Sequence, residues 1–407
     1  MSERIDSLPP IMDLPEGQLN AGWGKKNIVP DEPMRMAGIG IRKPYEQVHD
    51  STFARALVIN NGFEKVAIIS LDLLIFPPIV ADKVINELKQ KGYSSQNLYF
   101  SATHTHNAAG GWIKGPAGRI IAGKYQEKYV YQLVNAVVEA VKEAEKAAEA
   151  AQVGYGRYAA PELVFNRLVG EKGKTDPWIR LLKIETNSGK QAAMVTFSAH
   201  AVCLDYEEHS LSGDYPGKLV KLLEEEGSMD FAVFCAGAVG SHGPKADGAE
   251  NFDKMDSLAT GLFRHISKGH QNIAMHDSAD LHTFYMPVEL REPHLKIGKN
   301  TRLRPWVFNW MFGDYDPGFK VAKIGNTILV GTPCDFSGEL ALPIEAYYKE
   351  KGYDLIITSF NGGYIGYITP DEYYGLEKME TFEMNWFGPE NGAYFSEILM
   401  RLADKLE

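Results

Sequence analysis

Two histidines one residue apart, His104 and His106, stand just after a short apolar run, Asn97 to Phe100. We interpret the run as a buried strand. Alternate residues of a strand point to the same face, so both imidazoles are expected to project together from its carboxyl end. Neutral imidazoles are zinc ligands, and they can also stabilise an oxyanion. An HxH pair alone is more often a hydrogen-bonded loop than a metal site, so other residues must decide between the two.

Further polar side chains follow other predicted strands, where open α/β sheets bind their ligands. His200 follows a strand over 193–197 and Asp335 follows one over 327–330. Hydrolytic zinc sites combine imidazoles with one or two carboxylates and leave a position open for water. His104, His200 and Asp335 are therefore the first choice of metal ligands. Taken singly, His200 is more often a structural histidine, and Asp335 is equally well explained as a carboxylate near a helix start.

The elements that must position these residues alternate along the chain. Apolar runs and turn residues predict strands over 54–60, 65–71, 179–184, 193–197, 231–235, 319–324, 327–330 and 355–359. Helical spacing predicts helices over 79–91, 124–151, 216–226, 252–268, 338–351 and 393–405. With no repeat and no Pro-rich linker, one large α/β domain is expected. Residues 1–36 are interpreted as an irregular arm, and 271–318 as an irregular insertion over a pocket.

Composition excludes several classes of protein. The 407 residues are 44% apolar and 23% charged, as in soluble globular proteins, and the formal net charge of −11 argues against a general nucleic-acid binder. No apolar run is long enough to span a membrane, and the polar start lacks the apolar core of a signal peptide, although a removed export signal would leave no trace. Three cysteines give neither a disulfide framework nor a CxxC zinc motif. The sequence predicts neither the location nor the oligomeric state.

Several segments, in order, resemble the neutral/alkaline non-lysosomal ceramidases, which are zinc-dependent amidases that release a fatty acid from ceramide. The similar segments are Phe53–Val58 with Ser70–Asp72, Thr103–His106, Asn166-Arg167, Phe197–His200, Asp214–Gly217, Gly363–Thr369 and Gly388-Pro389. The resemblance covers the catalytic domain, which we place at 37–407. It implies a single domain with mixed β-sheets flanked by helices in α-β-β-α layers, and a site at the carboxyl ends of strands.

The resemblance also implies roles for individual residues. His104 and His200 would bind Zn²⁺, with Asp335 in the place of a family glutamate. His106 would contact the substrate or its oxyanion, and Arg167 would be a cation of the pocket. By the chemistry of these residues, His106 or a carboxylate such as Glu380 would take the proton of the attacking water. Zinc, His106 or Tyr364 would hold the oxyanion.

The sequence departs from the family pattern at three places. The tyrosine expected as a fourth zinc ligand aligns with Met379 or Glu380, so either the site has three protein ligands or Glu380 supplies an oxygen. The segment that carries the family's reaction-centre serine has Ser241 two positions early, and His242 is a candidate to replace that serine as a donor or an extra ligand. An immunoglobulin-like domain at the carboxyl terminus is not expected.

The sequence thus predicts a zinc-dependent amidohydrolase whose substrate is an N-acyl compound, with a ceramide-like lipid as one candidate. The alternative is a ceramidase-like protein that binds metal or ligand but has lost catalysis. The apolar residues of 306–312 are expected to form an acyl-chain groove or a membrane-facing lip, or else a local mini-core that anchors a long loop. Peripheral membrane contact is part of the first interpretation.

Overall fold

Two β-sheets lie face to face between two layers of helices. The computed structural model describes residues 15–38, 40–227, 229–246, 248–313 and 317–406. The larger sheet has eight strands. In spatial order they are β12 (Phe231–Phe234), β10 (Gln191–Thr196), β9 (Trp178–Thr186), β7 (Glu149–Ala159), β2 (Asn20–Asn27), β4 (Phe53–Asn60), β5 (Lys65–Leu71) and β6 (Leu98–Ala102). The smaller sheet has four strands, β15 (Leu281–Pro287), β18 (Gly318–Ile324), β19 (Thr327–Gly331) and β21 (Asp354–Thr358).

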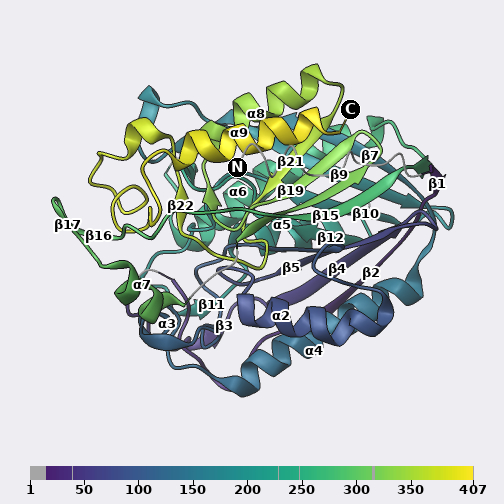
Figure 1. Ribbon diagram of the computed structural model, residues 1–407. Helices are drawn as coiled ribbons and strands as arrows, with labels where there is room; N and C mark the ends of the chain where they lie inside the picture. The colour runs from purple at the N-terminus through teal and green to yellow at the C-terminus, as the bar shows by residue number, and fades with distance from the viewer. Residues whose placement is uncertain (1–14, 39, 228, 247, 314–316, 407) are drawn as a thin grey trace.

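Helices cover the outer face of each sheet (Figure 1). Those on the larger sheet are α2 (Pro78–Leu88), α4 (Glu127–Ala147), α5 (Asp214–Glu225) and α6 (Asn251–Gly269). Those on the smaller sheet are α8 (Gly338–Glu350) and α9 (Asn391–Asp404). Buried side chains such as Leu57 and Ile68 from one sheet and Leu329 and Ile356 from the other form a third core between the sheets. The predicted α-β-β-α layering is confirmed.

Short elements complete the chain. They are the strand pairs β1 (Gly17–Gln18) with β14 (Ser278–Ala279), β3 (Gln47–Val48) with β11 (Ser210–Leu211), β8 (Val164–Asn166) with β13 (His242–Pro244), β16 (Lys296–Gly298) with β17 (Thr301–Arg302) and β20 (Asp335–Phe336) with β22 (Tyr367–Ile368), and the helices α3 (Gly115–Ile121) and α7 (Pro305–Phe312). Pairs β5–β6, β10–β12 and β19–β21 are parallel, so their carboxyl ends meet at common edges.

The predicted irregular arm is wrong for residues 20–27, which form β2 inside the larger sheet. Gly22 and Gly24 weaken the strand pattern in the sequence. They are needed because α4 packs directly on the backbone there: a Cβ on Gly22 would lie 2.3 Å from the Ala144 carbonyl oxygen, and one on Gly24 2.4 Å from that of Ala140. Residues 1–14 of the predicted arm lie outside the described residues.

Two other predicted boundaries are corrected. The helix expected over 124–151 ends at Ala147, and Glu149 already belongs to β7. The insertion expected over 271–318 is not irregular throughout, because β15 pairs with β18 in the smaller sheet. The β-branched and aromatic residues Thr283, Phe284 and Tyr285 within Leu281–Pro287 favour a strand, and the prediction overlooked them.

Candidate active site

Three histidines and one aspartate meet where the strands of the two sheets end. Nε2 of His104 lies 2.8 Å from Nε2 of His200 and 3.3 Å from Oδ1 of Asp335. The ring nitrogens that His104, His106 and His200 offer a metal all lie within 4.8 Å of one another. We call these four residues the histidine cluster. The sequence predicted all four as site residues, and the fold brings them together.

His104 is positioned by a turn and not by strand alternation. β6 ends at Ala102, and His104 has a left-handed backbone (φ 65°) whose N–H donates to the Leu73 carbonyl oxygen. The rings of His104 and His106 then meet edge to face, with centroids 4.9 Å apart. The expected juxtaposition is present, but the reason given for it was wrong.

The other two members come from the ends of strands in different sheets. His200 follows β10, and its backbone N–H donates to the His242 carbonyl oxygen. Asp335 begins β20, which pairs in parallel with β22 so that Asp335 lies directly beside Tyr367. The backbone therefore fixes an aspartate and a tyrosine next to the two facing imidazoles.

The tautomers of His104 and His200 leave the lone pair of each Nε2 pointing into the cluster. Nδ1 of His104 lies 2.5 Å from the Leu74 carbonyl oxygen and Nδ1 of His200 lies 3.4 Å from that of Val239. A carbonyl oxygen only accepts, so each Nδ1 carries the proton and each Nε2 of a neutral ring is a bare acceptor. Burial first, and then the nearby cation Arg167 and the other histidines, lower the pKa of His200 far below its usual range.

Two further buried polar atoms of the cluster have no hydrogen-bond partner among the described residues, namely Nε2 of His106 and Oδ1 of Asp335. Burial, followed by His104, Arg167 and Arg42, also lowers the pKa of His106 far below its usual range, which favours the neutral ring. A buried acceptor without a donor is costly, and facing acceptors repel one another. A divalent cation bound by imidazole nitrogen and carboxylate oxygen removes both penalties, so this donor set fits zinc.

Two tyrosine hydroxyls lie against the cluster. Tyr364 donates to Oδ2 of Asp335 (2.8 Å), and Tyr367 Oη lies 3.4 Å from Nε2 of His200. Burial raises the pKa of both tyrosines well above the usual range. Tyr364 was predicted as a site residue, whereas Tyr367 was not. Tyr367 lies nine residues beyond the end of β21, within the segment Gly363–Thr369 that resembles the family, and this resemblance is the signal that could have identified it.

Arg167 and Glu380 form a buried ion pair beside Tyr367. Nε of Arg167 lies 3.0 Å from Oε1 of Glu380, and Nη2 donates to the Tyr367 hydroxyl (3.2 Å). Burial would lower the pKa of Arg167, but Tyr367, Glu380 and Asp335 outweigh it and raise the pKa. The Glu380 carboxylate is therefore directed at a cation, and the oxygen beside His200 belongs to Tyr367. This geometry favours Tyr367 over Glu380 as a fourth ligand.

Ser241 and His242 resemble a nucleophile and its general base, but their hydrogen bonds are those of a structural pair. Nδ1 of His242 lies 2.8 Å from the Ser241 hydroxyl, while Nε2 accepts the backbone N–H of Asp176 (2.9 Å). Because Nε2 accepts, the proton of the neutral ring is on Nδ1, and the ring cannot take the proton of Ser241. Ser337 donates to the same serine oxygen. Both side chains are fully buried, and the imidazole of His242 is turned toward Asp176. A catalytic role for Ser241 or His242 remains a prediction, and these contacts do not favour it.

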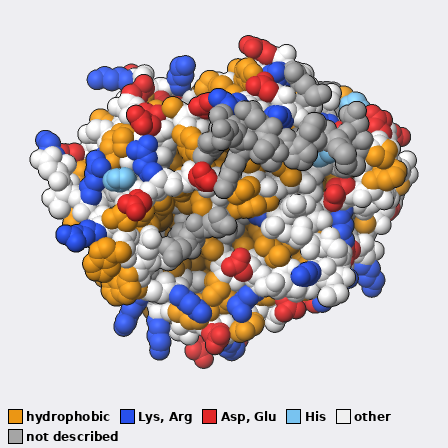
Figure 2. All heavy atoms as spheres, viewed as in Figure 1, with side chains coloured by type: hydrophobic (Ala, Val, Ile, Leu, Met, Phe, Trp, Pro, Cys, Tyr) orange, Lys and Arg blue, Asp and Glu red, His pale blue; other side chains and the backbone are white. Residues whose placement is uncertain are grey.

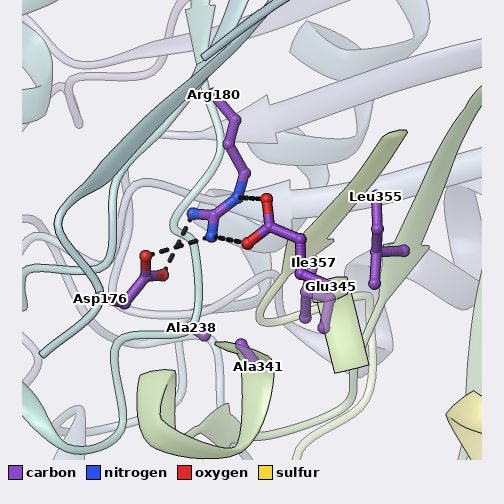
Figure 3. A pocket seen from close by; sticks show the side chains of 7 residues that line it. All are labelled: Asp176, Arg180, Ala238, Ala341, Glu345, Leu355 and Ile357. Carbon is purple, nitrogen blue, oxygen red and sulfur yellow. Dashed lines mark hydrogen bonds and ion pairs between the residues drawn. The ribbon is translucent and has the colours of Figure 1, made fainter. Parts of the chain in front are cut away.

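Behind this pair lies a second buried group, which we call the arginine network (Figure 3). The guanidinium of Arg180, on β9, lies between the carboxylates of Asp176 and Glu345. It donates twice to Asp176, at 3.1 Å each, and twice to Glu345, at 3.1 and 2.5 Å. Ser198 also donates to Asp176 (2.6 Å). No local sequence pattern predicted this network.

A large apolar cavity opens onto the histidine cluster. Its volume is about 780 Å³, and His104, His106, Tyr364 and Tyr367 line it. The remaining wall is mostly apolar and comes from five regions: Gly38 with Gly40, the segment after β5, α3 with the residues before it, α7 with Gly313, and residues 379–386. Cavities of this size enclose drug-sized or lipid-sized ligands. Neither Ser241 nor His242 is among the lining residues.

The comparison with known proteins agrees with this geometry. The family model described as neutral/alkaline non-lysosomal ceramidase, N-terminal, matches residues 34–259, which is more than half of the chain. The chain belongs to this family. The family predicted from the sequence is thereby confirmed. The matched segment contains His104, His106, Arg167 and His200 of the site.

Solved structures show the same fold. The neutral ceramidase from Pseudomonas aeruginosa matches with a TM-score of 0.81 and 18% identity, over 95% of this chain and 74% of the other. A second structure, a ceramidase complexed with C2, matches with a TM-score of 0.81 and 18% identity, over 95% of this chain and 75% of the other. At this identity the likeness establishes the fold. The part of this ceramidase-family chain that the structure describes contains no helix both long and apolar enough to cross a membrane.

Proposed function

We propose that this protein is a zinc-dependent amidohydrolase that cleaves the amide bond of an N-acyl lipid of the ceramide type. The observation that carries the proposal is the pair of facing Nε2 acceptors of His104 and His200, with Oδ1 of Asp335 beside them, at the wall of an apolar cavity. Membership of the ceramidase family supports a hydrolase acting on such a substrate. The cavity is large enough, and apolar enough, to enclose an acyl chain.

The proposed ligands are His104, His200, Asp335 and Tyr367. When bound, zinc supplies an activated water of lowered pKa and polarises a carbonyl group. The chain itself holds these ligands in place: Leu74 and Val239 fix the two imidazole tautomers, and Tyr364 holds the aspartate. Such supporting hydrogen bonds orient metal ligands and maintain their basicity.

His106 is the proposed proton acceptor and substrate contact. Its ring is neutral, it lines the cavity, and its Nε2 has no partner among the described residues. It can therefore accept a proton from the attacking water and return it to the leaving amine, as general acid–base catalysis requires. Arg167 is proposed to position Tyr367, because its charge is already shared with Glu380.

The test is hydrolysis of an N-acyl sphingoid substrate by the purified protein, before and after removal of metal with a chelator. The proposal predicts activity that is lost on chelation, restored by zinc and absent in His200→Ala. His265→Ala is the matched control, because His265 lies at the surface and pairs with Glu162. A zinc-loaded protein that hydrolyses neither amides nor esters would favour the alternative of a ceramidase-like binding protein.

A further inference from the structure

Two tryptophan side chains of the helix α7 are exposed to solvent. The chain has six tryptophans. Trp112 and Trp386 are buried, whereas Trp306 is 67% exposed and Trp310 is 66% exposed. They are four residues apart, so they lie on the same face of the helix. Tryptophan carries a large apolar surface, and two exposed side by side on one face indicate a surface that acquires a partner.

The opposite face of α7 is firmly packed, so the exposure does not come from a loose helix. Phe308 is buried and stacks on Phe312, with ring centroids 4.6 Å apart. It also meets the edges of Trp386 (5.3 Å) and Phe387 (6.0 Å). The structure thus answers the alternatives posed by the sequence: one face of α7 forms a mini-core, and the other face is presented to solvent.

The exposed face continues into the cavity. Trp310 and Met311 line the cavity, and so does Ile120 of α3, which packs against α7 and is 51% exposed. A residue that is both exposed and cavity-lining marks a place where the cavity reaches the surface. The mouth of the cavity is therefore bordered by apolar side chains of two adjacent helices.

Positive charge predominates on the α3 and α7 side of this mouth, although the chain as a whole is acidic, with a formal net charge of −11, and one exposed carboxylate, Glu383, lines the cavity from another segment. The segments 113–121 and 295–313 contain neither Asp nor Glu. Their exposed cations are Lys114, Arg119, Lys299, Arg302 and Arg304. Figure 2 shows hydrophobic side chains gathered over α7, at the lower left of the view, with Lys and Arg side chains beside them. Asp314 and Asp316, which follow in the sequence, lie outside the described residues.

We propose that this face, formed by α7, α3 and the β16–β17 hairpin, docks on an anionic lipid bilayer. The indoles of Trp306 and Trp310 lie at the level of the headgroups, where tryptophan is enriched in membrane-bound proteins. The surrounding Lys and Arg side chains face the lipid phosphates. The mouth of the cavity then opens onto the bilayer, so a lipid substrate enters without crossing water. The identity of that substrate rests on the proposed function. The docking itself does not.

Binding is tested with metal-stripped protein and substrate-free vesicles, so the outcome does not depend on catalysis. The vesicles are either phosphatidylcholine alone or phosphatidylcholine with phosphatidylserine, and bound protein is measured by co-sedimentation. We expect binding to the mixed vesicles, reduced at least about tenfold in the double variant Trp306→Ser/Trp310→Ser. Phe63→Ser is the matched control and should bind like the wild type. Phe63 is similarly exposed (64%) but lies in the β4–β5 turn, at the opposite end of β5 from the cavity.

The contribution of the positive charge to binding and the contribution of docking to hydrolysis are tested with separate variants. Arg302→Glu/Arg304→Glu should reduce binding to the mixed vesicles roughly tenfold or more and leave binding to phosphatidylcholine nearly unchanged. Trp306→Ser, which does not line the cavity, should lower hydrolysis of substrate embedded in vesicles and leave hydrolysis of a water-soluble short-chain amide unchanged. Equal binding of the wild type and the tryptophan variant to mixed vesicles would overturn the proposal. So would a wild type that does not bind vesicles and instead self-associates through Trp306 and Trp310.

Discussion

The histidine cluster and the arginine network are both buried groups of polar side chains, and the segment 239–242 contacts both. Its Val239 and His242 carbonyl oxygens hold His200, and the imidazole of His242 accepts from Asp176. The two groups differ in how their polar atoms are satisfied. Arg180 donates four hydrogen bonds to two carboxylates. In the histidine cluster, the Nε2 acceptors of His104 and His200 face each other, and His106 Nε2 and Asp335 Oδ1 have no hydrogen-bond partner among the described residues.

The contrast separates a structural role from a binding role. Buried charges that satisfy one another stabilise a particular packing and have no capacity left for a ligand. Buried acceptors without donors cost free energy in the metal-free protein, and a cation that binds them recovers it. The arginine network therefore holds the loop behind the site, while the histidine cluster is where chemistry is expected. Each prediction below perturbs one side of this comparison.

The largest effect is expected from Arg180→Met, which leaves the carboxylates of Asp176 and Glu345 buried without a cation. The free energy of unfolding, measured by urea denaturation, should fall by about 3–5 kcal/mol. Arg157→Met is the matched control, because Arg157 pairs with the same Glu345 from a side chain that is 35% exposed. Its cost should be under about 1 kcal/mol. Similar costs for the two variants would show that the network is not a buried support.

A somewhat smaller effect concerns pH. Burial lowers the pKa of His242 from 6.5 to about 4. Between these values the unfolded chain binds a proton that the folded protein does not, so this stabilising contribution is complete above pH 6.5 and is lost as the pH falls toward 4. The loss should reach about 3 kcal/mol.

The measurement for His242 is the unfolding free energy of wild type and His242→Gln across this pH range. The difference between the two proteins isolates the contribution of His242 from those of other titrating groups. A wild type and variant whose stabilities change in parallel with pH would contradict the assignment of a neutral, structural His242.

The smallest effect is expected from Tyr364→Phe, which removes the hydrogen bond to Oδ2 of Asp335. Loss of such a support should weaken zinc binding by about 10- to 100-fold, measured by competition with a chromogenic chelator. The stability of the metal-free protein should change little. An unchanged zinc affinity would mean that Asp335 does not need this tyrosine, or that Asp335 is not a ligand.

Local patterns predicted most of the fold and the central part of the site. Apolar runs on either side of turn residues identified β4 and β5, and helical spacing with Gly92 as a left-handed cap (φ 80°) identified α2 and its last turn. His104, His200 and Asp335 were found because they follow strands, and the carboxyl ends of adjacent strands meet in space.

The features that were missed depend on packing between distant segments. β2 was not predicted because its glycines weaken the local strand pattern. They are required by the close approach of α4, which lies far away in the sequence. The pairing of β20 with β22 places Tyr367 beside Asp335. The family pattern alone had instead made Glu380 the candidate for the fourth ligand. The arginine network joins β9 to α8 over 165 residues of sequence, so no local pattern indicates that Arg180 and Glu345 meet.

The central claim is that the histidine cluster is a metal site, and a calorimetric titration of metal-stripped protein with zinc tests it most directly. We predict one zinc ion per chain for the wild type and for His265→Ala, and none for His200→Ala. No binding by the wild type, or equal binding by His200→Ala, would contradict the assignment.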